Sequence, residues 1–189
     1  MKTGLYFGSF NPVHIGHMAI ANYVVEFTDI DEVWFVLSPH NPLKKKVTLL
    51  NDYARFELLE AAIGSDNRFR ASNIEFKLPK PSYTIDTLAY LREQFPKKEF
   101  TLIMGSDNLS TFNKWKNFEF IEENFTRYIY PRPQVQITPE HHKNVMVMDA
   151  PLIEISSSFI RDALKLGKNL RYFLPESVYE LIDKNGYYR

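Results

Sequence analysis

The sequence predicts an α/β fold, a Rossmann-like open parallel sheet with helices on both faces. The first observation is that short apolar runs alternate with segments of helical periodicity, which is typical of parallel strands joined by right-handed helical crossovers. The second is that residues 32–38 form a continuous apolar run bounded by turn residues, as expected of a strand buried on both faces. A length of 189 residues with 44% hydrophobic residues suits one domain, 1–189, with a sizeable core.

Six strands and six helices are predicted, and they alternate along most of the chain. The strands span 4–8, 32–38, 69–76, 99–105, 126–132 and 144–149. The helices span 14–27, 51–64, 84–95, the later part of 113–125, 156–168 and 175–186. Strand 69–76 is predicted from alternating apolar and polar residues, and helix 14–27 from apolar residues at helical spacing.

Capping and terminating residues mark most of the predicted helix boundaries. The first helix begins near Val13 or His14. The candidate caps of later helices are Asn51 or Asp52, Ser82 or Thr84, and Ser156 or Ser157. Helices end at or before Gly64, Pro96, Gly167 and Gly186, and Pro175 lies in the first turn of the last helix. Residues 131–144 are the least regular and are predicted to form a surface loop.

The charge balance and the absence of cysteine exclude several classes of function. Lys plus Arg and Asp plus Glu each number 23, so the formal net charge is zero, which argues against a general binder of nucleic acid or anionic membranes. Without cysteine the chain has no disulfide, thiolate nucleophile or cysteine zinc site. The N-terminus lacks the apolar run of a signal peptide, and no window approaches the ~18 apolar residues of a membrane span. We therefore expect a soluble, cytoplasmic protein; the sequence leaves its oligomeric state open.

Unusual polar segments follow the predicted strands. In open α/β sheets, ligands bind beyond the carboxyl ends of the strands. Five segments of the sequence are expected at that edge: 8–17, 38–46, 78–84, 105–108 and 155–161. Their convergence predicts a single site.

The segment "GSFNPVHIGH", residues 8–17, is a glycine turn that runs into a helix N-terminus, where free N–H groups and the helix dipole favour phosphate. His14 and His17 lie three residues apart, so they share a helix face and can both donate hydrogen bonds to phosphate oxygens. Gly16 costs roughly 1 kcal/mol relative to Ala inside a helix, and a flat group packed against the backbone would explain it. Alternatively, the histidines form a metal pair, which lacks a nearby acidic partner, or simply cap the helix and fill space.

Two further segments are candidates for phosphate and sugar binding. Ser157 and Ser158 lie at a predicted helix start with Arg161 one turn on, a combination that could clamp a polyphosphate. The alternative is an ordinary serine cap beside a surface arginine. Asp107 follows a strand and Gly105, a position that suits a ribose hydroxyl or a metal-bound phosphate, although a solvated loop aspartate fits equally well.

The lysine run 44–46 and Trp115 complete the candidates. A charge run is usually a solvated face, but one of the three lysines could reach a phosphate as a point charge. Trp115 lies in a polar setting, "NKWKN", which favours a lid or a stacking surface. A core position is the alternative, since Phe112 and Phe118 are close in sequence.

These motifs together resemble a known family. "GSFNPVHIGHM" resembles the G-x-F-x-P-x-H-x-G-H signature of the nucleotidylyltransferase superfamily, and "ISSSFIR" resembles its second motif, I-S-S-T-x-I-R. "PSYTIDTL" and "GSDNL" followed by Trp115 are similar to the bacterial nicotinate-nucleotide adenylyltransferases. The resemblance runs from Gly4 to about Ile182. Met18 replaces the usual Leu and Ser158 the usual Thr, which keeps the hydroxyl, and the 131–144 segment matches nothing we can assign.

The resemblance implies adenylyl transfer from ATP to nicotinate mononucleotide, giving deamido-NAD and pyrophosphate. It implies that ATP is bound by Gly8, Ser9, Phe10, His14, Gly16, His17, Gly105, Asp107, Ser157, Ser158 and Arg161. It implies that nicotinate mononucleotide is bound by Ser9, Lys44, Tyr83, Thr84 and Trp115. The catalytic residues it implies are His14, His17, Lys44 and Arg161. Mg²⁺ is expected to accompany ATP, bridging phosphate oxygens, without a metal site built by the protein.

Several alternatives fit the first motif. They are adenylyltransferases acting on nicotinamide mononucleotide or phosphopantetheine, cytidylyltransferases, class I aminoacyl-tRNA synthetases, and a non-catalytic nucleotide-binding regulator on the same fold. Backbone N–H groups near Thr84, at a helix start, would suit the nicotinate carboxylate and so favour the acid form. A nucleic-acid module is the least favoured, because no basic face with interleaved aromatics is present.

Overall fold

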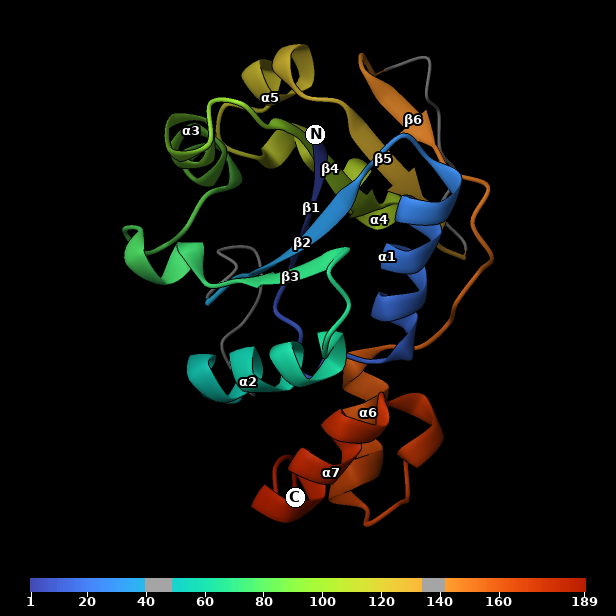
Figure 1. Cartoon of the computed structure of the whole chain (residues 1–189). Helices are drawn as coiled ribbons and strands as arrows, with labels where there is room; N and C mark the ends of the chain where they lie inside the picture. The colour runs from blue at the N-terminus through green and yellow to red at the C-terminus, as the bar shows by residue number, and fades with distance from the viewer. Residues whose placement is uncertain (40–48, 134–141) are drawn as a thin grey trace.

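The computed structural model describes residues 1–39, 49–133 and 142–189, and these form a sheet of six parallel strands flanked by helices (Figure 1). The strands are β1 (Lys2–Gly8), β2 (Glu32–Leu37), β3 (Phe69–Ser72), β4 (Glu99–Gly105), β5 (Arg127–Tyr130) and β6 (Val145–Val147). Their spatial order is β3-β2-β1-β4-β5-β6, all neighbours being parallel. This is the strand order of a doubly wound Rossmann fold, and it confirms the predicted fold class.

The helices lie where the periodicity predicts them, with small differences at the ends. They are α1 (Ile15–Phe27), α2 (Asp52–Ile63), α3 (Thr84–Gln94), α4 (Ser106–Leu109), α5 (Phe118–Asn124), α6 (Ser157–Lys165) and α7 (Glu176–Asn185). Short 3₁₀ turns lie at η1 (Ile74–Lys77), η2 (Phe112–Lys114) and η4 (Arg171–Phe173). The short helix α4 was not predicted.

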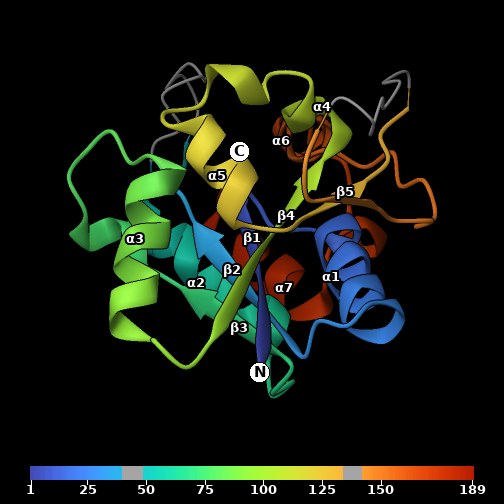
Figure 2. The same ribbon diagram turned by 90° about the horizontal axis from the view of Figure 1, so that it is seen from above.

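Two hydrophobic cores flank the sheet, because successive residues of a strand point to opposite faces. In β2, Trp34 belongs to one core, and Phe35 belongs to the other. Helices α1, α2, α6 and α7 pack on the Phe35 side, and α3 and α5 pack on the Trp34 side. Figure 2 shows this division, with α3 and α5 on one side of the strands and α1 and α7 on the other. Since the four central strands, β1, β2, β4 and β5, are mostly buried on both faces, polar chemistry is confined to the edges and ends of the sheet.

The register of the sheet brings the strand ends together. Gly8, the last residue of β1, pairs with Leu37 at the end of β2. Gly105, the last residue of β4, pairs with Tyr130 at the end of β5. The order of the strands reverses between β1 and β4, and the loops that leave this point diverge and open a crevice.

Three predicted boundaries are wrong, two of them because the Glu75 and Ser82 side chains bind each other. The predicted strand 69–76 ends at Ser72 and continues as the 3₁₀ turn η1, in which the carboxyl of Glu75 is buried. The residue before α3 is Tyr83, and the predicted cap Ser82 donates its hydrogen bond to Glu75 instead. Pro175 precedes the first turn of α7 as its N-cap residue.

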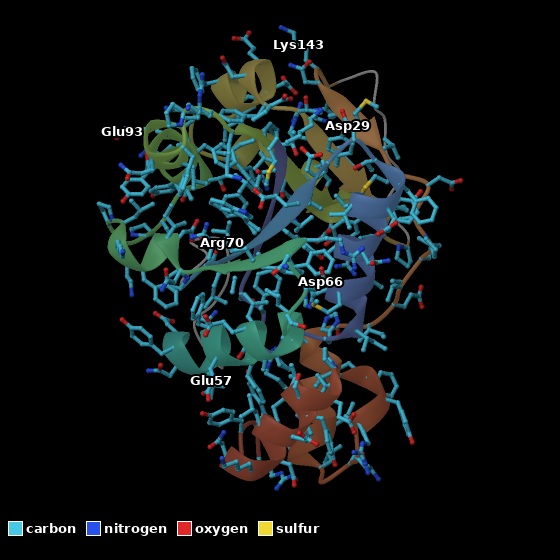
Figure 3. All side chains as sticks on the ribbon, in the orientation of Figure 1. Asp29, Glu57, Asp66, Arg70, Glu93 and Lys143 are labelled. Carbon is cyan, nitrogen blue, oxygen red and sulfur yellow. The ribbon has the colours of Figure 1, made fainter. Side chains whose placement is uncertain are left out.

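Charged side chains mostly lie on the outside, as Glu57, Glu93 and Lys143 do in Figure 3. The exceptions are three charged residues buried among the described part of the chain: Arg55, Glu75 and Arg127. Burial of a charge is costly unless it is paired or hydrogen-bonded, so each of these needs a local explanation. Within the described ranges, no helix is long and apolar enough to cross a bilayer.

Candidate active site

A cleft of about 560 Å³ lies at the carboxyl ends of β1, β4 and β5, where the strand order reverses. Its size suits a nucleotide-sized ligand. Three of the five segments predicted to converge contribute to its lining. From the loop after β1 and the start of α1 come Gly8, Ser9, Phe10, Asn11, His14 and His17; from α4, Asp107 and Asn108; and from α6, Ser156, Ser157, Ser158 and Arg161. The end of β5 adds Tyr130 and Arg132.

The two histidines are coupled at the start of α1. His14 is the N-cap residue, and the imidazole of His17 stacks on that of His14 with ring centroids 3.7 Å apart. His17 Nδ1 accepts a hydrogen bond from the backbone N–H of His14 at 3.3 Å. In a neutral His17 the ring proton then lies on Nε2, which makes Nε2 a hydrogen-bond donor.

His14 is neutral at physiological pH. Its side chain is almost fully buried, and this burial together with the positive charge of Arg132 lowers the pKa of His14 from 6.5 to about 4. A neutral imidazole contributes one N–H donor and no net charge. The formal positive charge of the described cleft lining therefore comes from the two guanidinium groups, Arg132 and Arg161.

The loop after β1 is held in shape by packing of its aromatic residue. Phe10 has a left-handed backbone, with φ of 40°, and its ring is 1% exposed, 5.1 Å from the ring of His17. A Cβ at Gly8 would lie 2.8 Å from the Phe10 ring, so the first motif needs glycine there. Phe10 thus contributes to the site through its backbone and through support of His17.

Two other glycines of the predicted site are explained by close protein neighbours. A Cβ at Gly105 would lie 2.3 Å from Oδ1 of Asp107, so glycine lets that carboxylate fold back toward the strand. A Cβ at Gly16 would lie 3.0 Å from the His14 ring and 3.1 Å from Ile153. Gly16 lines a small hollow of about 10 Å³ beside the cleft, together with both histidines and Arg132.

The start of α6 is hydrogen-bonded to the loop after β1. Ser156 caps the helix, accepting from the N–H of Phe159 at 3.2 Å. The Ser157 hydroxyl donates to the carbonyl of Pro12 at 2.9 Å, and Arg161 Nη1 donates to the carbonyl of Asn11 at 2.9 Å. The two motifs, separated by some 145 residues, therefore form one surface, with the N-termini of α1 and α6 both at the cleft.

A second, smaller hollow of about 80 Å³ shares Gly8 and Ser9 with the cleft. Ser38 and Trp115 also line it. The Trp115 ring lies 5.4 Å from that of Phe112 and is only partly buried, so this residue both packs on the core and presents a surface to the hollow.

Tyr83 and Thr84 line neither of these two hollows. Tyr83 precedes α3, and the ammonium group of Lys116 lies 4.7 Å above its ring. The same Lys116 pairs with Asp86 at 3.0 Å. The predicted role of Lys44, like that of Lys45 and Lys46, lies outside the described residues.

Arg132 is a cleft residue that the sequence analysis missed. Its guanidinium stacks over Tyr130 at 4.9 Å and donates to the Tyr130 hydroxyl at 3.1 Å, and its backbone N–H donates to the Ser106 hydroxyl at 2.9 Å. The sequence signal is its place at the end of a strand, because Arg132 is the last residue of the predicted strand 126–132 and the other site segments also lie at strand ends. The observed strand β5 ends at Tyr130, which leaves Arg132 beyond the sheet edge.

Arg55 is a second residue that the sequence analysis missed, although its buried guanidinium binds the loops that form the site. Its guanidinium is fully buried and donates to the carbonyls of Ser9 at 2.6 Å and Ser38 at 3.2 Å. It also donates to the Leu50 carbonyl at 3.0 Å and pairs with Asp52 at 2.6 Å. The sequence signal is an arginine on the apolar face of a helix, in line with Leu58, Leu59 and Ala62.

The donor set fits a Mg²⁺ ion that arrives with a nucleotide. No group of three or more His, Cys, Asp or Glu that could hold a metal occurs in the described part of the chain. Among the described lining residues of the cleft, the carboxylate is that of Asp107 alone. Mg²⁺ usually keeps several waters and binds through one or two carboxylates plus substrate phosphates, which is compatible with this lining.

Comparison with known proteins gives consistent matches over the whole chain. A family model described as cytidylyltransferase-like matches residues 5–163. A protein of Flavobacterium johnsoniae named "Probable nicotinate-nucleotide adenylyltransferase" is 50% identical over 100% of both chains. A protein of the same name from Cytophaga hutchinsonii is 50% identical over 100% of this chain and 98% of its own.

Solved structures share the fold. The nicotinic acid mononucleotide adenylyltransferase of Plasmodium falciparum complexed with NaAD superposes with a TM-score of 0.82 at 19% identity, covering 99% of this chain and 97% of that one. The same enzyme complexed with APC gives a TM-score of 0.80 at 18% identity, covering 99% and 96%. At these identities the similarity establishes the fold.

Replacing Arg55 by methionine should destabilise the protein and impair the site. The substitution removes the donors for the Ser9, Ser38 and Leu50 carbonyls, and we expect a loss of about 3 kcal/mol in the free energy of unfolding by urea denaturation. The control is Arg70→Met, since Arg70 is exposed on β3 with its guanidinium over Trp34 (Figure 3). Equal stability losses in the two variants would contradict the role assigned to Arg55.

Acidification should destabilise the protein through His14. Its pKa is about 4 when folded and near 6.5 when unfolded, so the unfolded chain binds the proton more tightly and stability falls as the pH drops below about 6.5. Between pH 7 and pH 5, the free energy of unfolding should fall by about 2 kcal/mol more in the wild type than in His14→Gln. Identical pH dependence in the two proteins would show that His14 is not buried as a neutral group.

Proposed function

Because the chain belongs to the cytidylyltransferase-like family and, within it, to the nicotinate-nucleotide adenylyltransferases, we propose that it transfers the adenylyl group of ATP to nicotinate mononucleotide, giving deamido-NAD and pyrophosphate. The observation that carries this function is the cleft at the reversal of strand order, to which two helix N-termini, two histidines and two arginines contribute. Such a set suits a triphosphate better than any neutral ligand. The reaction is a step of NAD biosynthesis.

The chemistry needs little from the protein beyond position and charge. An oxygen of the mononucleotide 5′-phosphate attacks the α-phosphorus of ATP, a new P–O bond forms, and the bond from the α-phosphorus to the bridging oxygen breaks. The electron pair leaves with pyrophosphate. Because the nucleophile is already an anion, no general base is required, and catalysis can come from alignment and from stabilising charge on the phosphates.

The residues of the ATP side have distinct proposed roles. His17 donates from Nε2 to a phosphate oxygen near the reacting phosphorus, and neutral His14 supports it by stacking. Arg161 and the N-terminus of α6 bind the leaving β- and γ-phosphates. Arg132 adds a second guanidinium on the opposite wall of the cleft. The catalytic role expected of Lys44 remains a prediction from the sequence.

We expect Mg²⁺ to bind with ATP, largely through phosphate oxygens and water; the carboxylate of the described cleft lining is Asp107, which lies 3.9 Å from Arg132. When bound, the ion would neutralise charge on the phosphate oxygens.

The smaller hollow is the proposed mononucleotide side. It adjoins the cleft through Gly8 and Ser9, so a ligand there faces the reacting phosphates. Trp115 offers a flat surface for the pyridine ring. The acid form of the substrate is supported by the relatives, which are named as nicotinate-nucleotide adenylyltransferases. The N-terminal N–H groups of α3, expected from the sequence to suit the carboxylate, start at Thr84, which lines neither hollow. A cytoplasmic location, with these two small molecules as partners, remains the expectation.

Mixing the purified protein with ATP, Mg²⁺ and nicotinate mononucleotide should release pyrophosphate. We expect kcat/KM for nicotinamide mononucleotide to be at least about tenfold lower, because an amide cannot use donors that suit a carboxylate. Preference for the amide would reverse the substrate assignment. Release only with phosphopantetheine would show a different adenylyl acceptor, and no release with any acceptor would favour a binding-only role.

His17→Ala should lose about 10²–10³-fold in kcat while remaining folded, as removal of one charge-stabilising donor does in other enzymes. The matched control is His142→Ala, because His142 pairs with Glu122 at 3.2 Å, next to β6 and away from the cleft. The control should keep wild-type kcat. Normal turnover by His17→Ala would remove His17 from the mechanism.

A further inference from the structure

Glu75 is a buried carboxylate that neither the mechanism nor the fold alone explains. It lies in η1, between β3 and α3, with 2% of its surface exposed. The other two buried charged residues have partners of opposite charge: Arg55 pairs with Asp52 and Arg127 with Glu122. Among the described residues, the side-chain partners recorded for Glu75 are hydroxyl groups only.

Two hydroxyls from the start of α3 bind this carboxyl. The Ser82 hydroxyl donates to Oε2 at 2.9 Å, and the Thr87 hydroxyl donates to Oε1 at 3.0 Å. Ser82 and Thr87 lie on either side of the start of α3, and η1, which carries Glu75, packs against β2. Ser38, directly after β2, lies near enough to lower the pKa of Glu75 against the opposing effect of burial. Glu75 therefore ties the N-terminus of α3 to η1, beside the carboxyl end of β2.

Both connected segments border the smaller hollow or carry residues predicted to serve it. Ser38 lines the hollow with Ser9 and Trp115. Ser82 directly precedes Tyr83 and Thr84, the two residues predicted to hold the mononucleotide. The larger cleft is lined instead by α1, α4, α6 and the ends of β1 and β5, none of which makes a recorded hydrogen bond to Glu75.

Stability alone does not account for a buried carboxylate at position 75. Burial raises the pKa of Glu75, which reflects the free-energy cost of holding its charge away from water and from any cation. An apolar side chain of similar size would fill the same space without that cost. What a carboxylate adds is two oxygens that accept hydrogen bonds from several directions and fix the distance between the donors.

We propose that Glu75 is a positioning residue for the pyridine mononucleotide, holding the start of α3 beside the carboxyl end of β2 at the spacing that this substrate requires. The role rests on the proposed function and deepens it. It places the residues that position nicotinate mononucleotide in a different part of the site from those that bind ATP. A substitution of Glu75 should therefore weaken binding of the mononucleotide and leave binding of ATP unchanged.

Steady-state kinetics of Glu75→Gln test this selectivity. The amide keeps the size of the side chain but offers one accepting oxygen in place of two, so a hydroxyl donor loses its acceptor. We expect KM for nicotinate mononucleotide to rise about tenfold and KM for ATP to change by less than about twofold. Thr87→Val and Ser82→Ala each remove one donor while keeping the carboxyl, and each should raise KM for the mononucleotide by about threefold.

Glu32→Gln is the matched control. Glu32 is a largely buried carboxylate that accepts from the Thr3 hydroxyl at 2.7 Å and pairs with Lys98, but it lies at the first residue of β2, at the opposite edge of the sheet. Its loss should lower Tm and leave both KM values unchanged. A purely structural role for Glu75 would make its variants behave like this control.

A binding measurement without turnover distinguishes a loss of mononucleotide affinity from a failure of the proposed reaction. Titration of nicotinate mononucleotide alone, followed by the intrinsic fluorescence of Trp34 and Trp115, should give a Kd about tenfold higher in Glu75→Gln than in the wild type, because Trp115 lines the hollow and Trp34 is buried in the core. Equal rises in both KM values, or no rise in the mononucleotide KM or Kd, would overturn the role of Glu75. Absence of pyrophosphate release by the wild type would instead refute the proposed function. If Glu75→Gln fails to fold, Thr87→Val and Ser82→Ala decide the question by the same criteria.

Discussion

The buried guanidinium of Arg55 is the interaction on which the site depends. Parallel strands all leave the sheet at one edge, and the loops that follow them expose backbone carbonyls there that no neighbouring strand can satisfy. Arg55 supplies donors to the carbonyls of Ser9 after β1 and Ser38 after β2, and to that of Leu50 before α2. A guanidinium has five donors in a rigid plane, so one side chain can fix three separate segments. Of these residues, Ser9 lines both hollows of the site and Ser38 lines the smaller one.

A second set of hydrogen bonds attaches the C-terminal helices to the same loop. Asn11 accepts from Arg161 through its backbone carbonyl at 2.9 Å and from the Tyr188 hydroxyl through Oδ1, also at 2.9 Å. The Oδ1 atom also accepts from the N–H of Leu50 at 3.1 Å. Helices α6 and α7 lie beyond α2, away from the strands (Figure 1). These hydrogen bonds hold the start of α6 against the loop before α1, and α7 packs on α2, the helix that carries Arg55.

Most of the fold could be predicted from the sequence, because its signals are local. A continuous apolar run predicted β2, a cap and a closing glycine predicted α2, and histidines three residues apart predicted a shared surface at α1. The failures at Glu75 and Ser82 involve side-chain partners outside helix or strand spacing, whereas α4 is a helix of only four residues and Pro175 lies directly before its predicted place in α7. The alternation around Glu75 predicts a strand, yet the hydrogen bonds that Glu75 accepts from Ser82 and Thr87 require a turn. Tyr188 and Asn11 are 177 residues apart, so nothing in the local pattern links them.

The wall formed by Gly8 and Ser9 has a consequence for the evolution of such a protein. Because these two residues face both hollows, a substitution there alters the surroundings of both ligands at once. The outer walls do not share this constraint, since one is built from α6 and the end of β5 and the other from the end of β2 and the segment around η2. Under the proposed function, a substitution along the outer wall of the smaller hollow changes the acceptor side and leaves the lining of the ATP side as it is.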